Sequence, residues 1–132
     1  MPLFTVLECP ILVYRTIFRK EWIRPDGSFK WQAFKPYRTD TLGVSVFITP
    51  EDIDDHSDKP FFGIASVKVG KVRDCSTAKY AVDVVQDMEW HANITGIPYP
   101  YLEEDLEDPT IAAKMRDICT SIKDNASRPF NP

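Results

Sequence analysis

Cysteine is scarce in this chain, and its spacing excludes the usual cysteine-based sites. The three residues, Cys9, Cys75 and Cys119, are odd in number and lie far apart, with no CxxC pair and no Cys/His cluster. A disulfide framework or a zinc site needs closely patterned cysteines, so the sequence predicts three reduced thiols. Reduced thiols are typical of a cytoplasmic protein, and that is the location we expect.

Long apolar runs and glycine-rich motifs are also missing. No run approaches the roughly 20 apolar residues that cross a bilayer, and the apolar N-terminus lacks the basic region of a signal peptide. Neither a P-loop nor a dinucleotide fingerprint occurs, and residues 43–47 lack the second glycine of a nucleophile elbow. We therefore expect no membrane span, no signal peptide and no cofactor.

The composition that remains is that of an ordinary folded domain. The chain has 132 residues, of which 43% are hydrophobic, and a net charge of −4. Residues 1–40 hold seven Lys/Arg and four Asp/Glu, whereas residues 41–132 hold nine and sixteen. Nucleic acid is therefore a disfavoured partner for the whole chain, although the basic end can attract anions. We expect one domain over residues 1–132.

Apolar patterning predicts several strands before a C-terminal helix. Runs rich in β-branched and aromatic residues occupy positions 11–18, 42–48, 61–73, 79–86 and 92–97. Residues 24–27 are a turn signal whose flanks pair as a hairpin, or else residues 29–34 form a short helix. Thr49 before Pro50 predicts the N-cap of a short helix, and residues 103–108 read as an acidic linker.

The predicted C-terminal helix runs from Thr110, as N-cap, to about Asn125. Its apolar stripe steps by four, three and four residues along Ile111, Met115, Ile118 and Ile122. The predicted fold class is α+β: a mixed or antiparallel sheet with this helix packed on one face.

The segment 19–38 alternates basic and aromatic side chains. Lysine and arginine hold phosphates, and aromatic faces stack on bases or similar rings. The alternative is an amphipathic segment whose rings face the core while its charges are solvated. The candidate ligand-binding residues are Arg19, Lys20, Trp22, Lys30, Trp31 and Lys35.

The acidic run 51–58 has the early spacing of a calcium loop but not its later part. Ser57 replaces the required glycine, and Gly63 replaces the closing glutamate. A solvated helix start is the better interpretation, and we predict no metal site.

Titratable groups crowd into residues 84–100, where a predicted strand ends. Asp87, Glu89 and His91 follow one another closely there, and His91 is one of only two histidines. Imidazole is the side chain best suited to proton transfer near neutral pH, so His91 is a candidate site residue. The alternative is a structural histidine that a neighbouring carboxylate satisfies.

Three further residues fall on successive predicted sheet elements. Arg15 lies mid-strand, Ser45 lies mid-strand between two valines, and Glu89 follows a later strand. This order resembles that of small ADP-ribosyltransferases, although the serine–threonine–serine pattern of that group is absent. The resemblance implies that Arg15 would hold the phosphates of NAD, Ser45 would order the pocket and Glu89 would grip the ribose. The candidate catalytic residues are therefore Arg15, Ser45, Glu89 and His91.

Short segments spread over residues 13–99 read YRTIFRKEW, PDG, AFK, VVQD and HANITGIPY. Together they resemble a group of small bacterial proteins, many of them cyanobacterial. The resemblance implies a cytoplasmic bacterial protein. That group has no established activity, so the resemblance implies no site residues.

Three functions agree with these observations. The leading interpretation is a small cytoplasmic accessory module that binds a protein partner or an anionic small ligand. One alternative is a nucleotide-dependent transferase or toxin-like enzyme of the ADP-ribosyltransferase type. The other is an immunity- or antitoxin-like inhibitor, whose acidic stretches 51–58 and 103–108 would cover a basic partner. Enzymatic activity and homo-oligomer formation both stay open at this point.

Overall fold

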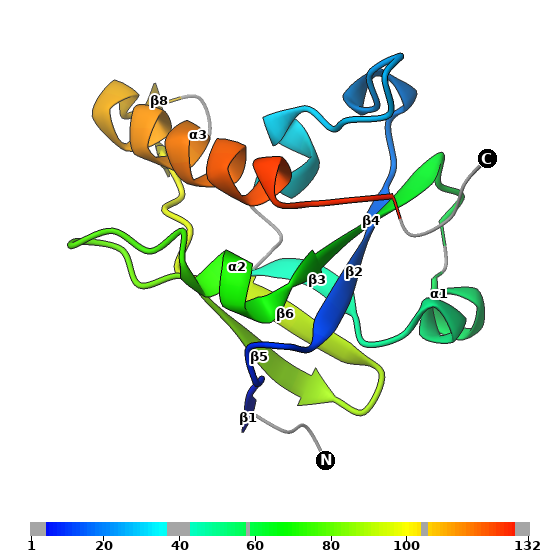
Figure 1. Cartoon of the computed structure of the whole chain (residues 1–132). Helices are drawn as coiled ribbons and strands as arrows, with labels where there is room; N and C mark the ends of the chain where they lie inside the picture. Colours follow the sequence, from blue (N-terminus) through cyan, green and yellow to red (C-terminus); the bar gives the residue numbers. More distant parts are fainter. Residues whose placement is uncertain (1–4, 37–42, 58, 104–105, 129–132) are drawn as a thin grey trace.

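The computed structural model describes residues 5–36, 43–57, 59–103 and 106–128. Its centre is a six-stranded antiparallel sheet with the strand order β1-β5-β6-β3-β2-β4. The strands are β1 (Thr5–Val6), β2 (Leu12–Ile17), β3 (Val44–Phe47), β4 (Gly63–Lys68), β5 (Asp83–Met88) and β6 (His91–Thr95). The predicted α+β class with a C-terminal helix is confirmed (Figure 1).

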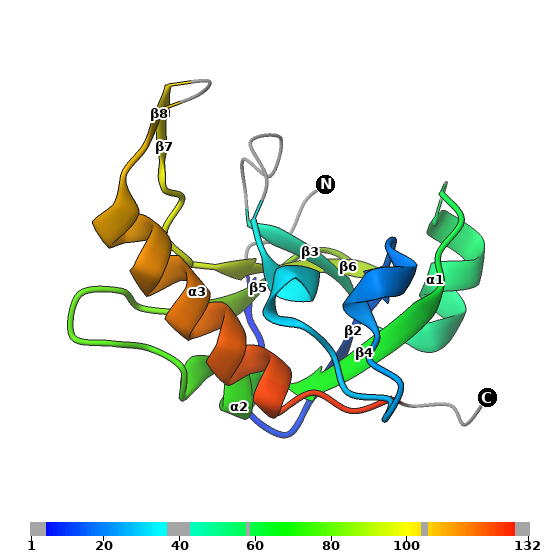
Figure 2. The ribbon, with the colours of Figure 1, turned by 90° about the horizontal axis from the view of Figure 1, so that it is seen from above.

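Short helices flank the strands and one longer helix ends the fold. They are the 3-10 helices η1 (Lys20–Trp22) and η2 (Trp31–Phe34) and the α-helices α1 (Pro50–His56), α2 (Val69–Arg73) and α3 (Pro109–Asp124). Figure 2 shows α3 and α2 on the same side of the sheet. In the described part of the chain, no helix combines the length and the apolar content that a bilayer crossing requires.

The main hydrophobic core lies between α3, η2 and one face of the sheet. Of the predicted stripe on α3, Met115, Ile118 and Ile122 are buried, and Ile111 is half-buried. Phe34 of η2 and the inward-facing residues of the strands belong to the same cluster. Apolar burial on this one face is therefore what holds α3 to the sheet.

The starts of α1 and α3 are fixed by capping side chains. Thr49 caps α1 as predicted: its Oγ1 accepts the N–H of Asp52 at 3.2 Å, and the Asp52 carboxylate accepts the N–H of Thr49 at 3.0 Å. The N-cap of α3 is Asp108 rather than Thr110, because Asp108 Oδ1 accepts the N–H groups of Thr110 and Ile111 at 2.9 and 3.2 Å. Aspartate is among the strongest N-caps, so the helix begins two residues earlier than predicted.

The prediction that residues 61–73 form one long or bent strand, with Gly63 and Gly70 marking a bulge or turn, is wrong at its second half, which is helical. Residues 69–73 form α2, because the N–H groups of Val69 and Gly70 donate to the carbonyls of Ile11 and Cys9 at 2.9 and 3.0 Å. These contacts hold the first turn of α2 against the segment just before β2. Val69 and Val72 are then both buried, at the spacing of one helical turn.

Two other segments also differ from a simple sequence interpretation. Residues 103–108 are not only a linker, because they contribute to a small hairpin of β7 (Tyr101–Glu103) and β8 (Leu106–Glu107). Around the predicted turn at 24–27, Gly27 has φ +88° and a single antiparallel bridge joins Ile23 to Phe29. The segment 19–34 is thus a short hairpin contact flanked by η1 and η2.

Candidate functional site

A polar site lies on the sheet face opposite the main core, where β3, β6 and β5 are neighbours. On β3, Ser45 lies between two valines that face the core, so its side chain points to the opposite face. On β6, buried Ala92 faces the core, and its neighbours His91 and Asn93 therefore share the face of Ser45. The alternation of side chains along β3 and β6 is therefore enough to place Ser45, His91 and Asn93 on one face of the sheet.

Strand register brings Ser45 and His91 into contact. Ser45 lies opposite Asn93, and Phe47 lies opposite His91, so Ser45 and His91 are diagonal neighbours across β3 and β6. Long side chains reach one another at such diagonal positions. Ser45 Oγ and His91 Nε2 are 2.5 Å apart, a short hydrogen bond.

A β-bulge supplies a carboxylate to the other side of the imidazole. The register of β5 and β6 shifts between Gln86, which lies opposite Ala92, and Met88, which lies opposite His91, so Asp87 is the extra residue of the bulge. Bulges of this kind re-aim side chains and are common beside active sites. Asp87 Oδ1 lies 2.7 Å from His91 Nδ1, and Asp87 Oδ2 accepts Asn93 Nδ2 at 3.1 Å.

The chemistry of the three groups fixes the direction of their hydrogen bonds. An ionised carboxylate only accepts, so His91 Nδ1 carries the proton that it donates to Asp87. In the neutral ring Nε2 then accepts the hydroxyl proton of Ser45. The arrangement is that of a serine whose proton can pass to a histidine, with a carboxylate holding the tautomer.

The site is sheltered but not sealed. The side chains of His91 and Asp87 are 16% and 9% exposed, Ser45 is half-buried, and Asn93 is buried. The carboxylate and its amide partner are thus withdrawn, while the serine–histidine end keeps some access to solvent. A hydroxyl that reacts with a substrate must be reachable from solvent, and half-buried Ser45 meets that requirement.

Arg15, predicted to share a pocket with Ser45, contacts the backbone instead. It lies at 5% exposure, in the alternation set of Val13 and Ile17, which face the main core. Its Nε donates to the carbonyl of Ala33 at 3.1 Å and its Nη1 to the carbonyl of Ser45 at 2.9 Å. Arg15 therefore ties η2 to β3 behind the polar site.

Glu89 lies in the two-residue turn between β5 and β6 and is exposed. Within the described ranges, its carboxylate makes no hydrogen bond or ion pair, and only its carbonyl is contacted, by Gln86 Nε2 at 3.5 Å. Of the four candidate catalytic residues, Ser45 and His91 are thus joined by a side-chain hydrogen bond. Neither Arg15 nor Glu89 takes part in the hydrogen bonds between the Ser45, His91 and Asp87 side chains.

Asp87 and Asn93 are site residues outside the four candidate catalytic residues, although the sequence interpretation placed Asp87 in the cluster around His91. The signal for them was partial: Asp87 precedes His91 by four residues, across the two-residue turn at 89–90, and Asn93 has the same strand parity as His91. The bulge that brings Asp87 to His91 has no local sequence signature. Without the bulge and with the same turn, Met88 would lie opposite His91 and Asp87 opposite Ala92, on the core face, so strand parity alone does not bring Asp87 to His91.

The candidate ligand-binding residues of segment 19–38 divide by exposure. Arg19 and Lys20 are exposed, whereas Lys30 and Lys35 are half-buried. Both tryptophans pack their rings against the main core, and each carries a guanidinium on its outer side. Arg19 lies 5.7 Å from the Trp22 centroid and Arg116 lies 5.4 Å from that of Trp31. Residues 37–38 lie outside the described residues.

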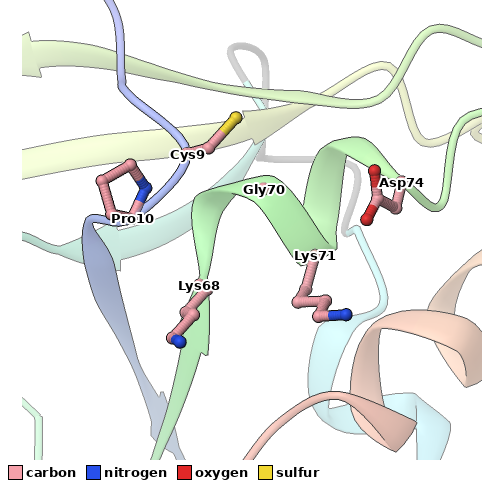
Figure 3. Close-up of a pocket in the computed structure, with 6 residues that line it drawn as sticks. All are labelled: Cys9, Pro10, Lys68, Gly70, Lys71 and Asp74. Carbon is pink, nitrogen blue, oxygen red and sulfur yellow. The ribbon is translucent and has the colours of Figure 1, made fainter.

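A shallow pocket of about 370 Å³ lies elsewhere, between the chain before β2 and the start of α2. It is lined by Cys9, Pro10, Lys68, Gly70, Lys71 and Asp74. Figure 3 shows the sulfur of Cys9 pointing away from the amino groups of Lys68 and Lys71. Arg73 Nη1 contacts this sulfur at 2.9 Å, and the same guanidinium binds Asp83 Oδ1 at 2.7 Å. The Cys9 sulfur therefore contacts Arg73, which also binds Asp83, and points away from the lysine amino groups at the pocket (Figure 3).

The three thiols are free, as predicted. Burial raises the pKa of Cys119 to about 12 and that of Cys75 to about 11, while Cys9 is exposed. Across the described ranges, no group of three or more His, Cys, Asp and Glu residues is placed to hold a metal ion.

No protein-family model matches this chain, and no curated protein and no solved structure matches it significantly.

Proposed function

We propose that this protein is a hydrolase of the acyl-transfer type, in which Ser45 is the nucleophile, His91 the general base and Asp87 the residue that orients His91. One observation carries the proposal: an unbroken chain of side-chain hydrogen bonds from Asp87 through His91 to Ser45. A hydroxyl bonded to an imidazole that is itself bonded to a carboxylate is the arrangement that activates serine on several unrelated folds.

The reaction follows from the direction of these bonds. Ser45 Oγ attacks the carbonyl carbon of an ester while its proton passes to His91 Nε2. Asp87 stabilises the imidazolium, which then protonates the leaving alcohol as the carbon–oxygen bond breaks. Water, deprotonated by His91, attacks the acyl group on Ser45 and releases the acid and the free serine. Asn93, opposite Ser45, keeps Asp87 in place through its Nδ2 group.

Hydrolysis of 4-nitrophenyl acetate tests this proposal. We expect turnover by the wild-type protein and its loss in Ser45→Ala and in His91→Gln. Ser121→Ala is the matched control, because Ser121 is exposed on α3 and bonds only within its own helix. Thermal unfolding of each variant separates lost chemistry from lost folding. Equal turnover by Ser45→Ala and wild type, at equal folded fraction, would show that the polar site is structural.

A second candidate function is the binding of an anionic ligand or partner by segment 19–38. The stacking of Arg19 on Trp22, at an exposed edge, favours it, because guanidinium–aromatic pairs of this kind also receive phosphates and bases. This module function and the hydrolase are compatible, since their residues do not overlap.

Binding of a fluorescent single-stranded oligonucleotide and of inorganic tripolyphosphate tests the second candidate. Exposed positive charge gives an affinity that falls steeply with salt. The double change Arg19→Gln with Lys20→Gln should weaken binding. Lys114→Gln, at an exposed position of α3, is the control. Binding that neither salt nor the double change alters would leave this segment a structural role only.

The remaining alternatives have less support. The ADP-ribosyltransferase-like reading needs Arg15 and Glu89 beside Ser45, but Arg15 bonds backbone carbonyls on the core side and Glu89 lies in an exposed turn. The inhibitor reading rests on charge alone, and part of residues 103–108 lies outside the described ranges.

A further inference from the structure

An aromatic cluster adjoins the proposed catalytic residues. Trp90, in the turn between β5 and β6, directly precedes His91, and the centroids of the two rings are 5.4 Å apart. The Trp90 ring carries the ring of His56 stacked on it, at 3.9 Å between centroids and 6° between planes. The centroid of the Phe47 ring lies 6.1 Å from that of Trp90, with 25° between the ring planes.

The turn that carries Trp90 is held in place by the sheet rather than by His56. The carbonyl of Trp90 accepts the N–H of Ile48, just beyond β3, at 3.3 Å. Phe47, which is 7% exposed, packs against both rings, with its centroid 6.1 Å from that of Trp90 and 6.0 Å from that of His91. Removing His56 from the stack therefore leaves the indole positioned beside the imidazole.

His56 is a weakly held cover. It is exposed, it is the last residue of α1, and within the described ranges its imidazole makes no hydrogen bond or ion pair. The helix itself is anchored elsewhere, by buried Ile53 and by the capping of Thr49. Stacking of the His56 ring on Trp90 changes the equilibrium constant for the stacked arrangement by about tenfold at most. The aromatic ring of a ligand can therefore displace the His56 ring.

We propose that Trp90 is the platform of a stacking subsite, in which a flat aromatic group of the substrate takes the place of the His56 ring. The inference rests on the proposed hydrolase function, and it names the substrate class: esters with an aromatic acyl or alcohol part. Stacking on the indole holds such a group one ring away from His91, because the Trp90 and His91 centroids are 5.4 Å apart, and His91 Nε2 lies 2.5 Å from Ser45 Oγ. Trp90 is then a specificity-determining residue, and His56 competes with the substrate for it.

The test separates binding from hydrolysis by using two matched alcohols, 2-naphthol and its saturated counterpart decahydro-2-naphthol. Binding to the Ser45→Ala protein is followed by two-dimensional NMR of the Trp90 indole N–H and of the His56 ring. We expect 2-naphthol to shift both signals, the saturated alcohol to shift neither, and Trp90→Leu to weaken binding by about tenfold or more. Trp90→Phe should keep part of the affinity, and Phe62→Leu, at an exposed aromatic residue outside both candidate sites, is the control.

His56→Ala gives a second, independent readout in the active protein. Removing the competing ring should lower KM for 2-naphthyl acetate by up to about tenfold and leave kcat unchanged. A raised KM would show that His56 supports the substrate instead of competing with it, and would overturn this part of the inference.

Failure of the subsite and failure of the proposed function look different. If 2-naphthol binds at Trp90 but no acetate is hydrolysed, the subsite stands and the hydrolase does not. If the acetates of both alcohols are hydrolysed with equal kcat/KM and neither alcohol shifts Trp90, the hydrolase stands and the subsite is overturned.

Discussion

At the scale of single residues, the proton on His91 Nδ1 is the feature on which the chemistry depends. Asp87 holds that proton on Nδ1 by accepting its hydrogen bond, and Asn93 holds Asp87 by donating to the second carboxylate oxygen. Ser45 therefore meets the ring nitrogen that can accept its proton. Each of these contacts is made by a side chain, so each can be removed by a single substitution.

The exchange Asp87→Asn tests the role of that proton. An amide in this position can donate to Nδ1, which favours the tautomer with its proton on Nε2 and leaves Ser45 without a base. We expect kcat for 4-nitrophenyl acetate to fall by on the order of 10⁴, the size of the same exchange in a serine protease. The protein should remain folded by circular dichroism. A kcat within a few-fold of wild type would contradict the orienting role.

The buried thiols predict how stability responds to alkaline pH. Burial raises the pKa of Cys75 and Cys119 from the ordinary value of 9.0 to about 11 and about 12. A group with a raised folded-state pKa contributes stability that is fully present below the unfolded pKa and is lost as pH rises through the folded one. We therefore expect the urea midpoint to fall from pH 9 upwards.

Comparison with a Cys75→Ala, Cys119→Ala protein isolates this effect from the titration of lysines and tyrosines. Its urea midpoint should fall less between pH 8 and pH 10.5 than that of the wild type. An equal fall in both proteins would show that the two thiols ionise as readily in the folded state as in the unfolded one.

At the scale of elements, local signals were reliable where the local chain decides the structure. The Thr49 cap, the turn with Gly27 and the stripe on α3 were predicted from a few neighbouring residues. Prediction was wrong where distant segments decide. Gly70 indicated a bulge or turn but not a helix, and the start of α2 makes backbone contacts with the distant residues Cys9 and Ile11.

The start of β5 shows the same limit. The sequence predicted a strand from residue 79, but β5 begins at Asp83. Thr77 Oγ1 accepts the N–H of Tyr80 at 3.1 Å and Ser76 Oγ accepts that of Val82 at 2.8 Å. Hydroxyl groups thus capture the backbone donors that a strand would have used.

Among the elements, α3 is expected to contribute most to stability. Ile118 is 2% exposed and belongs to the main core, so Ile118→Ala should lower the free energy of unfolding by about 2–5 kcal/mol. Lys114→Ala, exposed on the same helix, is the matched control and should change little. Chemical denaturation measures both. An unchanged midpoint for Ile118→Ala would mean that α3 does not hold the sheet through this stripe.

At the scale of the whole molecule, the two faces of the sheet have separate tasks. One face builds the core with α3, and the other presents Ser45, His91 and Asp87. The α+β class follows from the pattern of strands and helix, which is why it could be predicted. The pairing of Ser45 with His91 could not, because the sequence does not reveal that β3 and β6 are neighbours or that β5 carries a bulge.

The resemblance to small bacterial proteins and the cytoplasmic location stay predictions, because neither the fold nor the thiols decide them. The hydrolase proposal is independent of both. It depends on three side chains and their hydrogen bonds, and it can be tested on the isolated protein.

Labelling with a fluorophosphonate, mapped by peptide mass spectrometry, tests the central claim most directly, because the reagent phosphonylates serines that a neighbouring base activates. We predict one adduct per chain, on Ser45, that does not form in Ser45→Ala and forms far more slowly in His91→Gln, while Ser121→Ala reacts as the wild type does. No adduct on Ser45 under conditions that label a known serine hydrolase to completion, or labelling of Ser45 that is as fast in His91→Gln as in the wild type, would contradict the account.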